Sequence, residues 1–125
     1  MLPRTSLAGP ALLAFAATVL PALPAAAGYG AIAWDKETGR SGWSWDQATA
    51  AKAREVALSH CAASGCKVVM ESGAKQCLAL ATTQDRKHIG AASRATQDAA
   101  RLAAMTNCEK TKSGECVVRF SMCNK

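Results

Sequence analysis

Short segments of apolar and small residues follow one another along the chain, with polar turns between them. The first, Tyr29–Trp34, is rich in residues that favour strands, and a second segment at 41–45 follows it after a polar turn at 35–40. Gly39 in this turn can adopt the positive φ that tight hairpin turns require. We therefore predict an antiparallel hairpin over residues 29–45.

The register of this hairpin follows from its turn. If residues 35 and 40 pair, Ile32 lies opposite Trp43 and Gly30 lies opposite Trp45. Because side chains alternate between the two faces of a strand, both tryptophans and Ile32 then share one face of the sheet.

An alanine-rich segment without glycine or proline follows the hairpin and predicts a helix over 47–60. Asp46 precedes the segment and is a good N-cap residue. A narrow stripe of small residues at spacings of three and four would let the helix lie close to a sheet. After a turn at 64–65, the chain enters a predicted buried strand at 66–70. The stripe comprises Ala50, Ala53, Ala57 and Cys61.

The same order of elements recurs with a period of about 48 residues. Predicted strands at 77–82, 89–92 and 116–122 and a predicted helix at 94–107 repeat the first set, and cysteines fall at equivalent places. We interpret this pattern as an internal duplication, with copies at about 28–76 and 77–125. The predicted fold class is α+β: two tandem ββαβ repeats forming one disulfide-stapled domain with mainly antiparallel sheet, two helices and a shared core.

Residues 1–27 have the features of a secretory signal peptide. Arg4 supplies positive charge, an apolar run covers 11–20, and small residues at 25–27 form a cleavage site. The apolar run is bounded by Pro10 and Pro21 and is shorter than the roughly 20 residues that a spanning helix needs. We expect cleavage after Ala27, which leaves 28–125 as a secreted or periplasmic protein without a transmembrane segment.

Composition makes covalent cross-links important for this chain. Of its 125 residues, 50% are hydrophobic but only 5% are aromatic, and much of the apolar content is alanine. At about 25 cal/mol for each Å² of buried apolar surface, such a core is marginal. An exported chain meets an oxidising compartment, in which disulfides can form.

The six cysteines all lie in 28–125. Six cysteines allow fifteen pairings, and the repeated pattern narrows them. Two pairs would each enclose the turn between a helix and the next strand, and the third would join the two remaining cysteines. We favour the pairs Cys61–Cys66, Cys108–Cys116 and Cys77–Cys123.

A metal site is the competing interpretation of the first cysteine pair. His60, Cys61 and Cys66 are close in sequence and are all residue types that bind zinc. The second copy has Asn107 in place of His60, and export favours oxidised cysteines. We therefore predict no metal and no cofactor.

Two further groups of residues contain the side chains of catalytic sites. Asp85, His88 and Ser93 could form a triad, and Asp35 with Glu37 could form the acid and base of a glycosidase. Both groups lie at hairpin turns, where polar side chains ordinarily bond to the turn itself. We therefore predict no catalytic residue.

All three tryptophans of the chain, Trp34, Trp43 and Trp45, lie in the first hairpin. If exposed, they would form a stacking surface for sugars or for an apolar anchor of a partner. If buried, they would fill a core that is short of large residues elsewhere. They are the candidate ligand-binding residues of this sequence.

The formal net charge is +6, from fifteen basic and nine acidic residues. The basic residues are spread along the chain, and no nucleic-acid-binding motif is present, so a nucleic acid is not an expected partner. Weak attraction to anionic polymers or lipid headgroups of a cell envelope is expected.

Several segments together resemble the family catalogued as domain of unknown function 4189 (DUF4189). They are 29–33, the alanine-rich helix that ends in Cys61, the strand that begins at Cys66, the strand that begins at Cys77 and the closing segment 116–124. The resemblance covers nearly all of 28–125. It implies an exported bacterial protein, and it carries no assigned catalytic residues.

These observations predict an exported, disulfide-stabilised binding or interaction module, with an envelope polymer or another exported protein as its partner. The alternatives are a small envelope hydrolase and a secreted effector or inhibitor that acts on a foreign protein. A charged cleft that converges on Asp35, Glu37 or His88 would favour the enzyme. An aromatic patch around Trp43 would favour binding.

Overall fold

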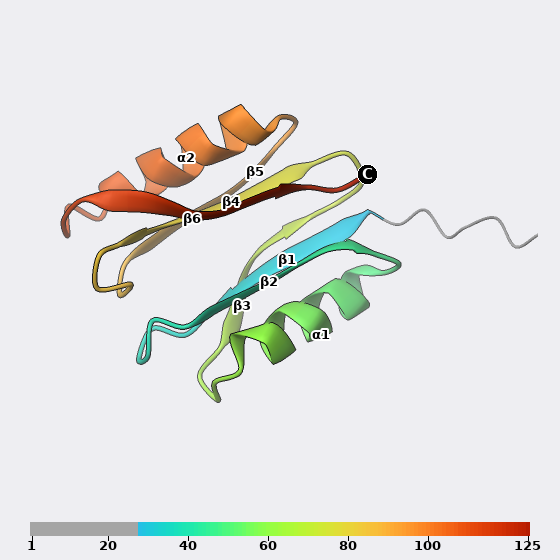
Figure 1. Ribbon diagram of the computed structural model, residues 1–125, viewed down its shortest axis with the longest axis horizontal. Coiled ribbons are helices and arrows are strands. Elements are labelled where there is room, and N and C mark those ends of the chain that lie inside the picture. Colours follow the sequence, from blue (N-terminus) through green and yellow to red (C-terminus); the bar gives the residue numbers. More distant parts are fainter. Residues whose placement is uncertain (1–27) are drawn as a thin grey trace, which may run out of the picture.

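The computed structural model describes residues 28–125, so the predicted signal peptide at 1–27 lies outside the described residues. The order ββαβ occurs twice along the chain, which confirms the predicted α+β fold (Figure 1). The elements are β1 (Tyr29–Trp34), β2 (Ser41–Gln47), α1 (Ala50–Cys61), β3 (Lys67–Ser72), β4 (Cys77–Thr83), β5 (Ile89–Arg94), α2 (Gln97–Glu109) and β6 (Cys116–Cys123).

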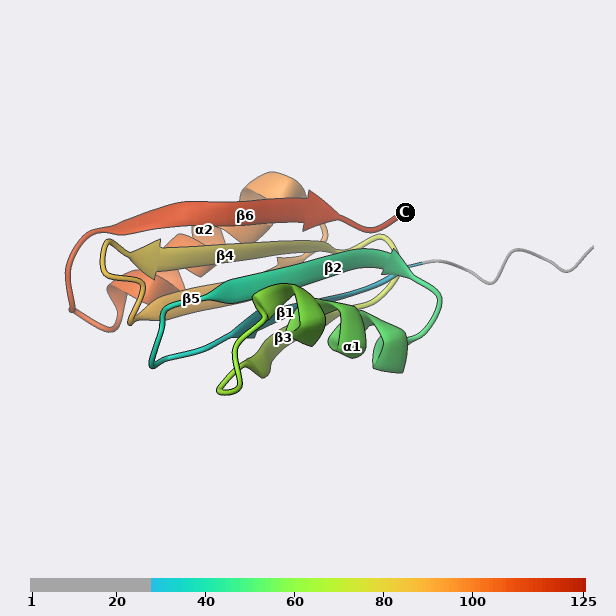
Figure 2. The ribbon, with the colours of Figure 1, turned by 60° about the horizontal axis from the view of Figure 1, so that its bottom comes forward.

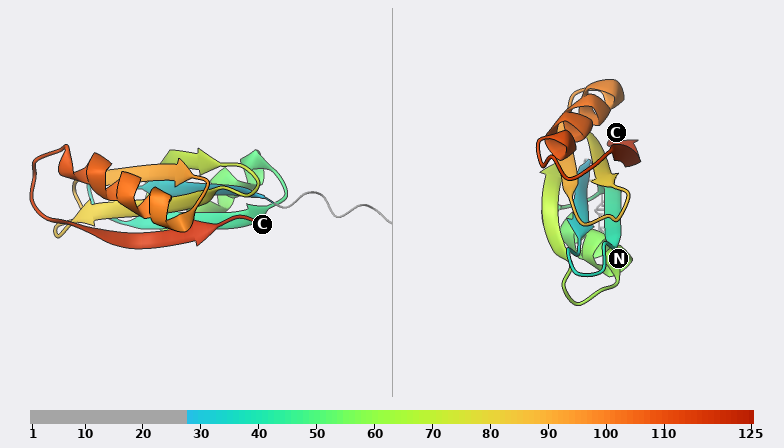
Figure 3. Two further views of the ribbon diagram at one scale, coloured as in Figure 1. Left: turned by 90° about the horizontal axis from the view of Figure 1, so that it is seen from above. Right: turned by 90° about the vertical axis from the view of Figure 1, so that its left-hand side faces the viewer.

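Each half of the chain forms its own antiparallel three-stranded sheet. The strand order is β2-β1-β3 in the first sheet and β5-β4-β6 in the second. The sheets lie face to face, and α1 and α2 cover their two outer faces (Figures 1 and 3). The molecule therefore has four layers in the order helix, sheet, sheet, helix.

The turns of both halves gather at one end of the molecule. The β1–β2 and β4–β5 turns and the α1–β3 and α2–β6 loops lie there, away from Lys125 (Figures 1 and 2). The two hairpin turns belong to different sheets, and at this end they lie next to one another. A Cβ on Gly39 would lie 2.8 Å from the Cβ of Arg86.

The register of the first hairpin agrees with the prediction at its centre and departs from it at one end. Ile32 pairs with Trp43, as predicted. Gly30, predicted to lie opposite Trp45, falls at a β-bulge: the register shifts between Tyr29 and Ala31, so two residues of β2 oppose this one glycine.

Both helices begin later than predicted. The first begins at Ala50 instead of 47 and the second at Gln97 instead of 94. Their N-caps are Thr49 and Thr96, whose side chains accept hydrogen bonds from backbone N–H groups of the first turn. Asp46 is not the cap: it lies in β2 with a φ of 52°.

Asp46 instead joins the end of β2 to the segment that follows β6. Its backbone N–H donates to Oδ1 of Asn124 at 2.9 Å, and its Oδ1 accepts from the N–H of Lys125 at 2.6 Å. The amide of Asn124 also donates to the hydroxyl of Ser72 at 2.7 Å and to the carbonyl of Gly73 at 3.1 Å. Asn124 is buried, and this one side chain bonds to the ends of β2 and β3 in the other half.

The buried apolar side chains form three clusters rather than one. The first, beneath α1, and the second, beneath α2, consist of alanine and cysteine. The third lies between the sheets, holds the larger side chains and draws on both halves, with Ile32 from β1 and Phe120 from β6. Its other fully buried members are Leu78 and Leu80.

The helices lie so close to the sheets that only glycine fits at one position beneath each. A Cβ on Gly42 would lie 2.2 Å from the carbonyl oxygen of Ala57 and from the backbone nitrogen of Cys61. A Cβ on Gly90 would lie 2.1 Å from the carbonyl oxygen of Ala104 and 2.2 Å from the nitrogen of Cys108. These atoms belong to helix backbone, which cannot move aside without moving the helix.

The three predicted disulfides are confirmed. Cys61–Cys66 and Cys108–Cys116 fasten the last turn of each helix to the start of the following strand. Cys77–Cys123 joins β4 to β6 at residues that pair directly across the second sheet. Within 28–125, no helix is both long and apolar enough to cross a membrane.

We predict that Gly42→Ala and Gly90→Ala each lower the free energy of unfolding by about 3 kcal/mol or more, because the added methyl collides with helix backbone. Urea denaturation of the oxidised protein measures this loss. Gly73→Ala is the matched control, since its Cβ would meet nothing closer than 3.8 Å. Equal effects at all three glycines would contradict the close-approach explanation.

The disulfides should differ in their contribution to stability. Cys77–Cys123 closes a loop of sequence separation 46, against 5 and 8 for the other two. Loop-closure entropy then gives about 4 kcal/mol for the long loop and about 2 to 2.5 kcal/mol for each short one. Replacing both long-loop cysteines with alanine should therefore lower the urea midpoint more than either matched double replacement. A larger loss from a short-loop pair would contradict this ranking.

Candidate functional site

The three tryptophans of the first hairpin divide between two places. Trp43 is half-buried and packs against the cluster between the sheets, where its ring stacks on Phe120 at a centroid distance of 4.6 Å and an interplanar angle of 17°. Trp45 is 39% exposed and lies 6.3 Å from the same phenylalanine ring. Trp34 lies at the other end of the hairpin, next to the turn.

Next to Trp43, the His60 side chain of α1 covers the edge of β2. The His60 ring of α1 meets the Trp43 ring edge-on at 4.8 Å, and its Nδ1 lies 3.3 Å from both the backbone N and the carbonyl O of Trp43. An open pocket of about 390 Å³ lies beside this contact, lined by Trp43, Ser44, Trp45, Gln47, Val56 and His60. Trp43 is thus a half-buried packing residue, and Trp45 is the more exposed of the two.

Trp34 forms part of a second pocket, of about 430 Å³, beside the β1–β2 turn. Its indole N–H donates to the carbonyl of Arg86 at 2.9 Å, so a residue of the β4–β5 turn fixes the orientation of this ring. Because the N–H is occupied, the ring offers only its apolar surface to a ligand. The pocket is lined by Trp34, Asp35, Lys36, Glu37, Gly65, Lys67 and Val69.

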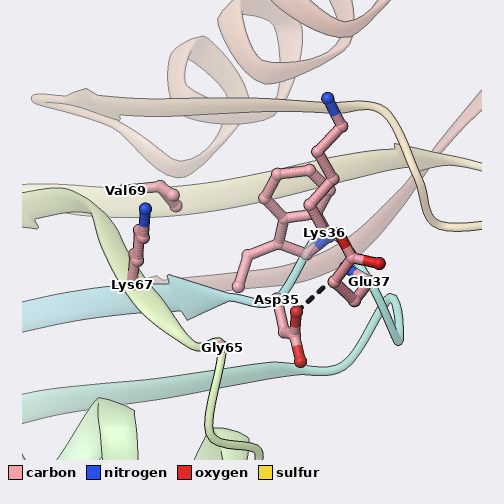
Figure 4. A pocket seen from close by; sticks show the side chains of 7 residues that line it. Asp35, Lys36, Glu37, Gly65, Lys67 and Val69 are labelled. Atoms are coloured by element: carbon pink, nitrogen blue, oxygen red, sulfur yellow. Dashed lines mark hydrogen bonds between the residues drawn. The ribbon is translucent and has the colours of Figure 1, made fainter.

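Asp35 is 3% exposed and its carboxylate bonds within its own turn. Its Oδ1 accepts from the N–H of Glu37 at 2.9 Å (Figure 4). Its Oδ2 accepts from the hydroxyl of Thr38 at 2.9 Å. A Cβ on Gly65 would lie 2.7 Å from Oδ1, so the α1–β3 loop passes directly over this carboxylate. Asp35 therefore holds the turn, and Glu37, which is exposed, is the free carboxylate of the pocket.

Two lysines stand on opposite sides of this pocket. Lys67 rises from β3 and Lys36 from the β1–β2 turn, and their ammonium groups point to the same side (Figure 4). Among the ion pairs of the described residues, none includes either lysine. The pocket thus combines an apolar floor with two free cations and one free carboxylate.

The residues of the other two candidate sites, the metal site and the catalytic triad, are not arranged to form those sites. Cys61 and Cys66 form a disulfide, so they offer no thiolate to a metal, and within 28–125 no cluster of three potential ligands occurs. Ser93 lies in β5, about 16 Å from His88 along an extended chain, which is too far for a triad.

Asp85 lies in the β4–β5 turn and has an interaction of the same kind as Asp35. Hydrogen bonds from the hydroxyl of Thr83 at 2.6 Å and from the N–H of Lys87 at 3.0 Å hold the pKa of Asp85 below its usual value, with smaller contributions from the nearby positive charges. These bonds stabilise the turn, and the carboxylate is not positioned as a general acid or base.

The fold and these pockets define a small disulfide-bonded α+β protein with two aromatic surface pockets. The sequence profile described as Domain of unknown function (DUF4189) matches residues 29–123, and the chain belongs to that family.

Among solved structures, the chain is similar to Rv1813c from Mycobacterium tuberculosis, determined by NMR. The two share 32% sequence identity with a TM-score of 0.57, over 84% of this chain and 81% of that one. No curated protein matches the chain. Three disulfides fit an extracellular or periplasmic protein.

The sequence indicates Trp34 as a candidate but does not indicate the residues that surround it. Lys67 and Val69 come from β3, and the Arg86 carbonyl comes from the other half of the chain. Spacing along one hairpin could not indicate them. The one available signal was the repeat, which places the two hairpin turns at equivalent positions.

We predict different roles for the two tryptophans of β2. Trp43→Ala should lower the free energy of unfolding by about 3 kcal/mol, because it removes a stacked ring from the cluster between the sheets. Trp45→Ala should cost about 1 kcal/mol or less, because that ring is 39% exposed and lies outside the cluster between the sheets. Urea denaturation followed by far-UV circular dichroism measures both. Similar losses would mean that Trp45 also belongs to the core.

Proposed function

We propose that this protein is an exported binding module whose ligand occupies the pocket next to Trp34. The observation that carries the proposal is the pocket's composition: an apolar ring in a fixed orientation, with Lys36, Glu37 and Lys67 around it and no ion pair to either lysine among the described residues. Binding pockets typically combine apolar lining with a few placed polar groups. Export is supported by the three disulfides and by the features of 1–27.

Binding, rather than catalysis, is the activity that these contacts support. The acid and base of a glycosidase are two carboxylates that are both free to act on the ligand, and in this pocket only Glu37 is free. Asp35 is the buried carboxylate of the pocket, and both of its oxygens already accept hydrogen bonds from its own turn. The remaining groups, two ammonium ions and an exposed carboxylate, recognise charge and hydroxyl groups.

The three indole N–H signals of a ¹⁵N-labelled sample test this proposal, because each tryptophan has one such signal. The disulfide-bonded protein is titrated with a panel of neutral sugars, sugar acids, amino sugars, aromatic carboxylates and tripeptides. We expect ligands to shift the Trp34 indole signal together with the amides of Lys67 and Val69. A panel in which no member shifts these signals, or in which shifts centre on Trp45, would overturn the proposal.

A variant with its matched control sharpens the result. Trp34→Phe makes the apolar surface of the pocket floor smaller and removes the indole N–H that donates to the Arg86 carbonyl, so ligand affinity should fall at least tenfold. Trp45→Phe makes the same chemical change in the same hairpin outside the pocket and should leave affinity within twofold. The urea midpoint of each variant shows whether the fold is retained.

A further inference from the structure

We infer that the ligand of the Trp34 pocket is an acidic saccharide, a sugar unit that carries a carboxylate. This inference rests on the proposed function and adds the chemical class of the ligand. It follows from which groups of the pocket are free and which are already bonded.

The floor of the pocket favours a ring with an apolar face. The Trp34 N–H is occupied by the Arg86 carbonyl, and Val69 is the other apolar lining residue. A pyranose ring presents C–H groups from its face and directs its hydroxyl groups sideways. Such a ring can stack on the tryptophan while its hydroxyl groups reach the rim.

The rim contains both donors and an acceptor. The ammonium groups of Lys36 and Lys67 only donate hydrogen bonds, and the carboxylate of Glu37 only accepts them. A ligand that carries hydroxyl groups satisfies both kinds of group at once. An aromatic carboxylate without hydroxyl groups would leave Glu37 without a donor and close to a like charge.

The charges favour an acidic sugar over a neutral one. Within the pocket the charges balance: Asp35 keeps its negative charge, because the groups that donate to it are a neutral N–H and a neutral hydroxyl, so the two lysines face two carboxylates. The excess of positive charge comes from two arginines beside the pocket. Arg40 in the same turn and Arg86 in the adjoining turn are also exposed. Among the described ion pairs, none includes any of these four basic side chains. The end of the molecule at which the turns gather is therefore suited to hold an anion.

Size agrees with a short stretch of such a saccharide. A pocket of about 430 Å³ lies within the range of small-ligand sites and accommodates one or two sugar rings. It is open to solvent between β3 and the β1–β2 turn, so further units of a polymer can continue beyond it (Figure 4).

Calorimetric titration of the disulfide-bonded protein with three probes tests the inference. The probes are a tetrasaccharide of β-1,4-linked glucuronate, the neutral β-1,4-linked glucose tetrasaccharide of the same backbone, and tetraglutamate as an anion without sugar. We expect the glucuronate probe to bind at least tenfold more tightly than either of the others. Its affinity should fall as salt is raised from 20 to 200 mM, because the Debye length shortens.

Matched charge variants locate the effect. Lys36→Gln with Lys67→Gln should weaken glucuronate binding at least tenfold. Lys75→Gln with Lys125→Gln removes the same charge at the opposite end of the molecule and should change binding less than threefold. All four lysines are exposed, so the fold should tolerate both variants. Equal losses in the two variants would mean that net charge alone attracts the probe, and would overturn the inference.

The outcomes separate this inference from the proposed function. Equal binding of the neutral probe, or equal or tighter binding of tetraglutamate, overturns the acidic saccharide while leaving a ligand in the pocket. The same holds if none of the three probes binds while another compound of the panel shifts the Trp34 indole signal. If no probe and no panel member reaches that signal, both proposals fail.

Discussion

The contact on which the rest of the structure depends is the approach of each helix backbone to the sheet beneath it. At Gly42 and at Gly90, a single methyl group would fall 2.1 to 2.2 Å from helix backbone atoms. Surfaces this close leave room only for small side chains, which is why the buried members of the clusters beneath both helices are alanine and cysteine, and Val68 and Met105 pack only at their margins. Alanine buries little apolar area, so these layers stabilise the fold weakly. The disulfides at the end of each helix offset that weakness by tying the helix to the next strand.

Much of the fold was predictable because it is local or repeated. The hairpin around residue 35, the alanine stripe from Ala53 to Cys61 and the three cysteine pairs follow from spacing and from the equivalence of the two halves. What the sequence could not indicate depends on distant contacts. Asp46 has the chemistry of an N-cap, but its carboxylate bonds to the chain at residue 125. The glycine of β2 looks like a weak point of a strand until the helix above it is known.

The candidate site was predictable to the same extent. The concentration of tryptophan in one hairpin indicated the element that carries the candidate site. From the hairpin alone, however, the three rings cannot be assigned different roles. The second sheet makes them different: Phe120 accepts the ring of Trp43 in the interior, and the Arg86 carbonyl fixes the ring of Trp34 beside a pocket. The division of roles among these rings is therefore a property of the packed pair of halves.

The hydrogen bonds of Asn124 also set the order in which this structure can be completed. A chain emerges from the ribosome with its N-terminal half first. The N–H of Asp46 and the hydroxyl of Ser72 belong to that half, yet their partner lies 78 and 52 residues further on. The cysteines at 61 and 66 can close early, whereas the ends of β2 and β3 wait for the final strand. The Cys61–Cys66 bond therefore needs only the first half of the chain, whereas the hydrogen bonds at the ends of β2 and β3 need its last residues.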